Sequence, residues 1–331
     1  MAGASKRNCL NVMIRRRKFE STGGVILRRD VLAMGYDDRY IAARLRAKEW
    51  VRIRHGAYVA TALWDELGVE DQHRVRARAV LRTAKSPVAL SHVSSGLEWG
   101  GEAWDLDLGD VHVTRLDGKC GRREAGVDQH RGAVDLSSIR EHDGVPLLDA
   151  ARTVVDVSRM TDVEHALVVA NSLLHIGATS LEECRAAASA MDGWPDTLTT
   201  RLVLGLADGR IESVGESRTS YLLWSQGLPR FEPQYQVRDH TGRVVARVDF
   251  AWPELGAFLE FDGRIKYDEL PEGKTLAQVL REEREREKLI CRLTGWVCIR
   301  IGWRDLEYPE RVAHEIRAIL ASRRAVPGSS A

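Results

Sequence analysis

The chain has 331 residues, of which 44% are hydrophobic, and this length is enough for two or three domains that each bury a core. Its net charge is only +1 at pH 7, so only locally basic segments can indicate a nucleic-acid partner. No apolar run approaches the roughly 18 residues of a membrane helix, and the five cysteines show no metal-ligand spacing. We therefore expect a cytoplasmic protein with reduced thiols, no membrane association and no small-molecule cofactor.

Composition and pattern separate five segments along the chain. The first is basic but lacks the apolar core of a signal peptide, so we interpret it as a flexible arm. We expect an α/β multidomain protein with a basic arm at 1–19, a winged helix-turn-helix at 20–65, a mixed α/β middle domain at 66–208, a further α/β domain at 209–323 and a disordered tail at 324–331.

Two short helices are predicted near the N-terminus. Residues 28–35 predict a helix that ends at Gly35, because glycine suits the left-handed conformation that often follows a helix end. Asp37 or Asp38 can then cap a second, basic helix over 38–50 by accepting a hydrogen bond from its first turn.

A basic hairpin is predicted after the second helix. Residues 51–59 form two short strands around His55 and Gly56. Helix, tight turn, basic helix and basic hairpin together are typical of a winged helix-turn-helix, which binds duplex DNA through phosphates and base edges. The alternative is a winged helix that binds another protein. The candidate DNA-binding side chains are Arg39, Arg46 and Lys48 on the helix, and Arg52, Arg54 and His55 on the wing.

The middle segment mixes strands and helices. Strands are predicted at 110–114 and 127–131, and helices at 149–160, 163–174 and 181–191. Its histidines show no metal-ligand spacing, and we interpret them as structural or surface residues: His92, His112, His130, His142, His165 and His175.

The last domain has the clearest order of elements. That order is helix, three strands, helix, strand and helix, at 212–226, 235–238, 244–250, 257–262, 278–293, 296–301 and 309–320. Asp249 lies at the end of the second strand, and Glu260 lies within the third. Two carboxylates on adjacent strand ends can share Mg²⁺, which binds one or two of them and keeps its other positions for water and phosphate oxygens. The pair therefore predicts metal-dependent nuclease chemistry.

This αβββαβ order with these acids resembles the PD-(D/E)XK nuclease superfamily, and residues 210–322 resemble its Vsr-like endonuclease domains of unknown specificity. The matching motifs are GESRTSYLLWSQGL, VARVDFAWPE, FLEFDGRIKY, REEREREKLICRLTGW and VCIRIGWRDL. Residues 20–62 resemble the winged helix of AbiEi-type antitoxins in GGVILRRDVLAMGYDDRYIAARLRAKEWVRIRHGAYV. Residues 85–160 resemble the segment that follows it in those proteins, in ALSHVSSGLEWG, VHVTR and DGVPLLDAARTVVD.

The resemblance implies roles for five residues. Asp249 and Glu260 would ligate Mg²⁺ (or Mn²⁺), and Glu216 would be the helix acid that leans toward the metal, unless it is an ordinary first-turn glutamate. The superfamily's lysine normally stands two residues after the second acid, where this chain has Asp262. Lys266 is our candidate for the missing cation, with an exposed loop lysine as the alternative, and Asp262 could instead bind a second metal.

Three functions follow from these patterns. The first is a DNA-binding, Mg²⁺-dependent endonuclease, favoured by the retained Asp249, Glu260 and Glu216. The second is a non-catalytic regulator of the antitoxin type with a degenerate nuclease fold, favoured by Asp262 at the lysine position and by the near-neutral charge. The third is an adaptor whose winged helix binds a protein partner.

Overall fold

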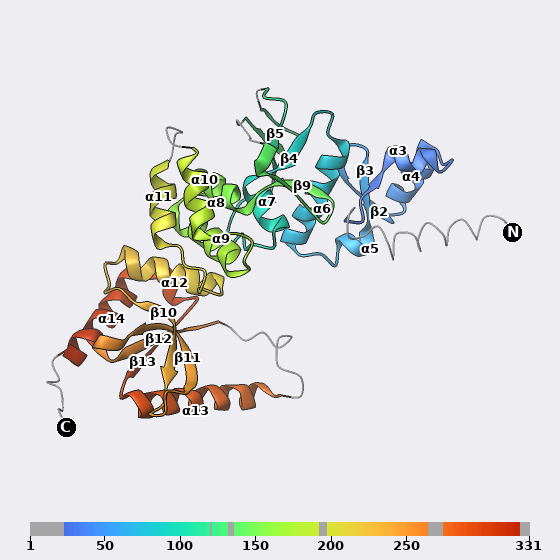
Figure 1. The fold of residues 1–331 in the computed structure, drawn as a ribbon. Coiled ribbons are helices and arrows are strands. Elements are labelled where there is room, and N and C mark those ends of the chain that lie inside the picture. Colours follow the sequence, from blue (N-terminus) through green and yellow to red (C-terminus); the bar gives the residue numbers. More distant parts are fainter. Residues whose placement is uncertain (1–22, 120, 132–135, 192–196, 264–273, 325–331) are drawn as a thin grey trace. The chain divides into compact units, whose positions relative to one another are not determined.

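The computed structural model describes residues 23–119, 121–131, 136–191, 197–263 and 274–324, in two compact units (Figure 1). The first unit comprises Met1–Val169 and Ile176–Leu204, and the second comprises Ala170–His175 and Gly205–Ala331. The arm expected at 1–19 and Lys266 lie outside the described residues, as does the tail expected at 324–331 apart from its first residue. Among the described residues, none of the helices has both the length and the apolar character needed to cross a membrane.

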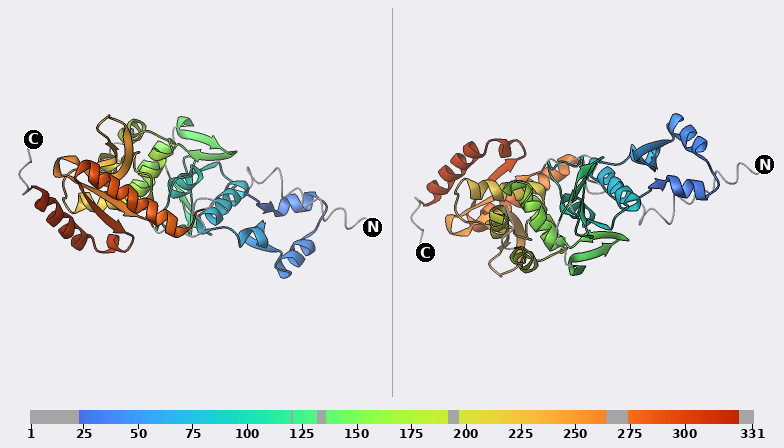
Figure 2. Two further views of the ribbon diagram at one scale, coloured as in Figure 1. Left: turned by 90° about the horizontal axis from the view of Figure 1, so that it is seen from below. Right: turned by 90° about the horizontal axis from the view of Figure 1, so that it is seen from above.

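The first unit begins with the winged helix-turn-helix predicted from the sequence (Figure 2, blue). Gly35 has a φ of 86°, which makes the turn between the two helices, and the Asp37 side chain accepts a hydrogen bond from the Tyr40 N–H and caps the second helix. The second helix is shorter than expected, since Lys48 has a φ of 54° and a strand begins at Trp50. The sheet order is β1-β3-β2, and the elements are β1 (Ile26–Leu27), α3 (Arg28–Ala33), α4 (Asp38–Arg46), β2 (Trp50–Arg54) and β3 (Ala57–Ala60).

The longer helix α6 (Val69–Thr83) packs on this small sheet and on the sheet that follows it. Val75 and Ala79 lie in one apolar cluster with Leu27 of β1, while Ala77 and Val80 lie in a second cluster with the middle strands. Because one helix contributes to both cores, the winged helix and the middle region pack as one body.

The middle region contains a sheet of six strands in the order β6-β7-β5-β4-β9-β8. In chain order the strands are β4 (Val88–Leu90), β5 (Val111–Arg115), β6 (Arg123–Glu124), β7 (Val127–His130), β8 (Ile139–His142) and β9 (Val145–Leu148). The helices of this region are α5 (Thr61–Trp64), α7 (His92–Glu98), α8 (Ala150–Ser158), α9 (Val163–His175), α10 (Leu181–Ser189) and α11 (Thr197–Leu206), of which α9 and α11 end in the second unit. The strands and helices predicted here are present, to within a few residues at their ends.

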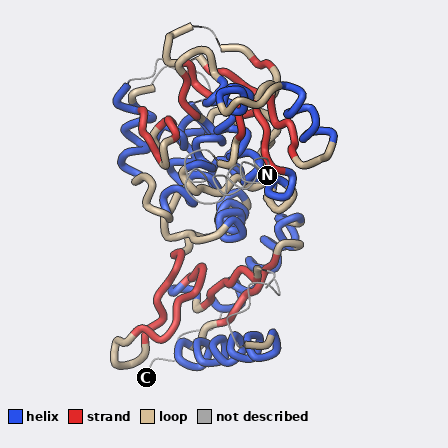
Figure 3. Tube along the Cα trace, turned by 90° about the vertical axis from the view of Figure 1, so that its right-hand side faces the viewer, coloured by secondary structure: helices blue, strands red, loops and turns tan. Residues whose placement is uncertain are grey.

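The second unit has a four-stranded sheet in the order β10-β11-β12-β13. Figure 3 draws its strands in red and the helices in blue. The first three strands pair antiparallel, and β12 and β13 pair in parallel, so the chain crosses over between them through α13. The elements are α12 (Val214–Ser225), β10 (Glu232–Arg238), β11 (Val244–Trp252), β12 (Ala257–Asp262), α13 (Leu276–Thr294), β13 (Val297–Gly302) and α14 (Pro309–Arg324).

Helices cover both faces of this second sheet (Figure 1). On one face Leu223 of α12 and Ile316 of α14 pack against Phe250 and Leu259, and on the other Ile290 of α13 packs in a cluster with Phe258. This is the αβββαβ order predicted from the sequence, followed by the last helix. Buried layers on both faces hold the two strands that carry Asp249 and Glu260 in fixed positions.

Candidate functional site

The second helix of the winged helix-turn-helix, α4, has an exposed face that combines two arginines with two small alanine side chains. Arg39, Ala42, Ala43 and Arg46 recur at helical spacing and are all exposed, while Ile41 is buried on the other side. Two alanines between two arginines leave the backbone accessible, so this face can approach a flat or grooved surface closely. It has the chemistry required of a helix in the major groove of DNA.

The wing carries the remaining candidate cations. Arg52 and His55 are exposed, and Lys48 is exposed just before β2. Arg54 differs from these, because its side chain is half-buried and Nη1 donates to the Ala125 carbonyl at 3.2 Å. Five of the six predicted side chains are therefore available to a partner, and Arg54 is engaged within its own unit.

Asp249 and Glu260 lie on adjacent strands of the second unit, as the sequence predicted. Phe250 of β11 pairs with Leu259 of β12, and continuing this register by one residue places Asp249 opposite Glu260. The ladder opens at this point, because Asp249 Oδ2 accepts a hydrogen bond of 2.7 Å from the Phe261 N–H.

Burial and neighbouring charge make both carboxylates weak acids. Burial, with a smaller contribution from the charges of Glu260 and Glu216, raises the pKa of Asp249 to about 7 against the lowering effect of the Phe261 hydrogen bond. Burial also raises the pKa of Glu260, although the Arg286 guanidinium opposes the shift. The sequence did not indicate this arginine, which donates from Nη2 to Glu260 Oε2 at 2.7 Å.

Glu260 is left with one unsatisfied oxygen. Its Oε1 is buried and has no hydrogen-bond partner among the described residues. Leaving a buried carboxylate oxygen unpaired costs stability. This oxygen is therefore a candidate ligand atom for a cation.

Glu216 is held near these acids by the start of α12. A side chain at Gly215 could not be accommodated, since a Cβ there would lie 2.0 Å from the Phe261 ring. This close approach places Glu216, which is buried, near enough for its charge to act on Asp249. Glu216 Oε1 accepts a hydrogen bond from the Ser213 hydroxyl at 2.8 Å, and the Glu212 N–H donates to Oε2 at 3.1 Å.

Gln234 of β10 is a second residue that the sequence did not indicate. Its Nε2 donates to Glu216 Oε2 at 2.7 Å. Its backbone has a φ of 53°, which is uncommon for a residue other than glycine and costs energy. The pairing of β10 with β11 continues on both sides of this position, with Pro233 opposite Phe250 and Tyr235 opposite Val248.

Among the described residues, a cation lies beside the acids on an element that we did not name. Asp262 lies exposed at the end of β12, and Lys266 lies outside the described residues, so its predicted role stays a prediction. Within the described part of the chain, Arg286 of α13 is the side chain that pairs with Glu260, and it also donates to the Arg247 carbonyl at 2.9 Å.

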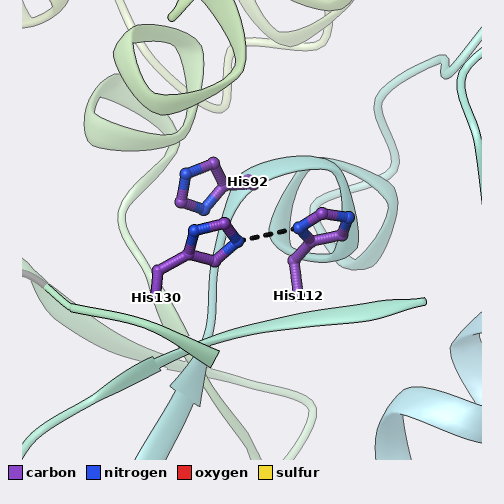
Figure 4. Close-up of side chains that lie close together, drawn as sticks. All are labelled: His92, His112 and His130. Atoms are coloured by element: carbon purple, nitrogen blue, oxygen red, sulfur yellow. Dashed lines mark hydrogen bonds between the residues drawn. The ribbon is translucent and has the colours of Figure 1, made fainter. Parts of the chain in front are cut away.

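Three of the histidines that we interpreted as structural or surface residues lie together in the structure. Figure 4 shows His92, His112 and His130 side by side, with one ring nitrogen of each within 4.8 Å of the others. Their spacing in the sequence gave no sign of this, because they come from three different elements of the middle sheet region.

The front end of the chain is similar to a known protein family. Residues 16–61 match the family described as "Transcriptional regulator, AbiEi antitoxin". This range contains the whole of α3, α4, β2 and β3 of the winged helix, including all six predicted DNA-binding residues.

Two proteins of Mycobacterium tuberculosis are similar over a longer stretch. They are Uncharacterized protein MT2308, from strain CDC 1551 / Oshkosh, and Uncharacterized protein Rv2248, from strain ATCC 25618 / H37Rv. Each is 31% identical over 167 residues, which are 50% of this chain and 58% of the relative. The aligned part thus spans little more than half the length of the relatives.

Proposed function

We propose that this protein is a DNA-binding transcriptional regulator whose winged helix holds duplex DNA. The exposed face of α4, with Arg39 and Arg46 on either side of two alanines, is the observation that carries the proposal. The match of residues 16–61 to a family of transcriptional regulators supports it. Lys48 and the wing residues Arg52 and His55 would contact phosphates, which fix position and supply most of the affinity.

DNA binding by the full chain tests this proposal. We expect the protein to shift a random-sequence duplex at about 50 mM salt. The double variant R39A/R46A is expected to bind at least about tenfold more weakly, since each neutralised phosphate contributes to binding. Arg29→Ala is the matched control, because it removes an exposed arginine from α3 rather than from α4. If wild type does not shift duplex DNA, the winged helix is instead an adaptor that binds a protein partner.

A regulator would select one DNA sequence over the random background. Enrichment of a randomised duplex library on the full chain should yield a recurring sequence, because base-edge contacts from α4 discriminate between bases. Recovery of unselected DNA after repeated rounds would contradict sequence-specific regulation while leaving general DNA binding intact.

A second candidate function, metal-dependent DNA cleavage, is favoured by the carboxylates of the second unit. Asp249 and Glu260 lie on adjacent strands, and buried Glu260 Oε1 has no hydrogen-bond partner among the described residues. An all-oxygen donor set of this kind suits Mg²⁺ or Mn²⁺ rather than a soft metal. The residues present therefore fit the cation that the nuclease resemblance implies, with Asp249 and Glu260 as its protein ligands.

The chain's own side chains would position this group for phosphodiester hydrolysis. When bound, the cation supplies a Lewis acid and a water of lowered pKa. Arg286 holds Glu260 in place, and Ser213 and Gln234 orient Glu216 toward the same region. Asp262, exposed at the end of β12, remains a candidate for a second cation.

Cleavage of plasmid and single-stranded DNA with Mg²⁺ or Mn²⁺ tests this second function. We expect nicking by wild type and none by Asp249→Asn, which keeps the size of the side chain but loses its charge. Glu254→Gln is the matched control, as it removes an exposed carboxylate from the turn between β11 and β12. Should neither cation support nicking by wild type, the second unit is not a nuclease and the regulator proposal stands alone.

A further inference from the structure

Two neighbouring strands of the middle sheet each place a histidine on the same face. β5 and β7 run parallel, with His112 opposite Asp128 and Thr114 opposite His130. Because side chains alternate along a strand, residues two apart share a face, so His112 and His130 both point to the side on which Asp128 lies. His112 Nδ1 and His130 Nε2 lie 2.8 Å apart in a hydrogen bond (Figure 4).

A third histidine reaches the same point from the start of α7. His92 stacks on the His130 ring at a centroid distance of 3.7 Å. It does so from a backbone φ of 52°, a left-handed conformation that costs energy for a residue with a side chain. Its Nδ1 lies 3.0 Å from the Ser91 hydroxyl, which holds one ring nitrogen and leaves Nε2 for another partner.

Burial acts on all three rings of the cluster. It lowers the pKa of His112 to about 4 and that of His92 well below its ordinary value, and it lowers the pKa of His130 as well. The positive charges of Arg152 and Arg159 also lie near enough to lower the pKa of His92. An imidazole binds a metal through a ring nitrogen that carries no proton. The charge of Asp128 acts on both His112 and His130, so a carboxylate lies close by.

We propose that His92, His112 and His130 form a binding site for a divalent transition-metal ion of the Zn²⁺ class. Three imidazoles and one open position are the ligand arrangement of catalytic rather than structural zinc sites. Tetrahedral coordination at about 2.0–2.1 Å would separate two ligand nitrogens by about 3.3 Å. The present 2.8 Å contact between His112 and His130 would therefore widen by about half an ångström.

A pocket gives the ion and a fourth ligand a route from solvent. His112 lines a pocket of about 360 Å³ together with Asp110, Asp128 and Arg123. Asp110 is paired with Arg123, and Asp128, which also lines the pocket, would attract a cation. An imidazole site selects Zn²⁺, Co²⁺, Ni²⁺ or Cu²⁺ over Mg²⁺, which sets it apart chemically from the carboxylates of the second unit.

Cobalt absorption of the full chain tests the proposal. Metal-free protein titrated with Co²⁺ should bind one equivalent and show the strong visible bands of four-coordinate cobalt, and Zn²⁺ should remove them by competition. The bands should lack the near-ultraviolet charge transfer of a thiolate ligand, because the site contains no cysteine. His112→Gln and His130→Gln should each weaken Co²⁺ binding by at least about tenfold.

Two control variants separate this site from the rest of the chain. His142→Gln changes a partly exposed histidine of the same sheet, and Asp249→Asn changes the acidic group of the second unit. Both should bind Co²⁺ as wild type does. Circular dichroism of each metal-free variant checks that it folds. If His112→Gln does not fold, the Co²⁺ affinity of His130→Gln tests the proposal, because His130 is the more exposed of the two rings. Absence of a cobalt spectrum in wild type, or equal binding by a folded His130→Gln, would show that the cluster is a hydrogen-bonded histidine group only.

Discussion

Gln234 Nε2 donates a 2.7 Å hydrogen bond to Glu216 Oε2 from a backbone position whose φ is 53°. The strained backbone and the hydrogen bond occur at the same residue, where a side chain of β10 contacts the start of α12. Such strain persists where the surrounding structure maintains it, and it is commonly found at functional sites.

Replacing Gln234 should therefore lower stability. Gln234→Ala removes the donor to a buried carboxylate and keeps the unfavourable φ, so we expect a loss of about 1–2 kcal/mol in the free energy of unfolding. Gln234→Gly loses the same donor but relieves the backbone, and it should be less damaging than Ala. Urea unfolding of both variants beside Gln236→Ala, an exposed glutamine on the same strand, measures the difference. Equal midpoints for all three would mean that the hydrogen bond is not important.

The close packing of α12 on β12 makes a second prediction. A Cβ at Gly215 would lie 2.0 Å from the Phe261 ring, so Gly215→Ala should destabilise the second unit by about 1–3 kcal/mol. Adding Phe261→Leu should recover part of the loss, since the smaller side chain frees space. Gly205→Ala in α11 is the control, because a Cβ there meets nothing within 4 Å and alanine favours the helix. If Gly215→Ala and Gly205→Ala unfold at the same temperature, the close contact between Gly215 and Phe261 does not limit side-chain size at Gly215.

The salt dependence of DNA binding should give the number of phosphates that the protein neutralises. The logarithm of the binding constant falls linearly with the logarithm of salt concentration, by about 0.9 for each phosphate neutralised on B-DNA. Arg52→Ala on the exposed wing should reduce this slope by about 1, while Arg54→Ala should change it less because Arg54 is half-buried and donates to Ala125. Fluorescence anisotropy at several salt concentrations provides both slopes. A larger change for Arg54→Ala would mean that the wing contacts DNA differently.

Acid should destabilise the first unit through His73. This buried ring lies 3.0 Å from the Leu108 carbonyl through Nδ1 and 2.8 Å from the Ser94 hydroxyl through Nε2, and burial lowers its pKa. The folded chain therefore binds the proton more weakly than the unfolded chain, whose histidine titrates near pH 6.5. Its stability contribution is complete above about pH 6.5 and is lost as pH falls through the lower, folded-state pKa.

Urea unfolding at several values between about pH 7.5 and 5 tests this sign. His73→Gln should be less stable than wild type at the upper end, where it loses packing and hydrogen bonds. Its midpoint should also fall less steeply with acid, although part of the slope remains because other buried histidines titrate. A parallel slope for wild type and variant would show that His73 does not titrate on unfolding.

Local pattern determined much of the second unit and of the winged helix. Gly35 and Asp37 indicated where one helix ends and the next begins, and the structure has the turn and the cap there. Asp249 and Glu260 could be paired from the sequence because a short antiparallel connection brings nearby strand ends together. These features depend on residues close in the chain, whose periodicity and turn residues can be recognised from the sequence alone.

Tertiary structure alone decided which distant groups meet. Arg286 reaches Glu260 only because β12 and β13 pair in parallel with α13 between them, and no spacing in the sequence encodes that crossover. His92, His112 and His130 converge because β5 and β7 are parallel neighbours and β4 lies beside β5. Strand order is a property of long-range pairing, so side chains that are 18 or more residues apart gave no common signal in the sequence and yet form one cluster in the folded chain.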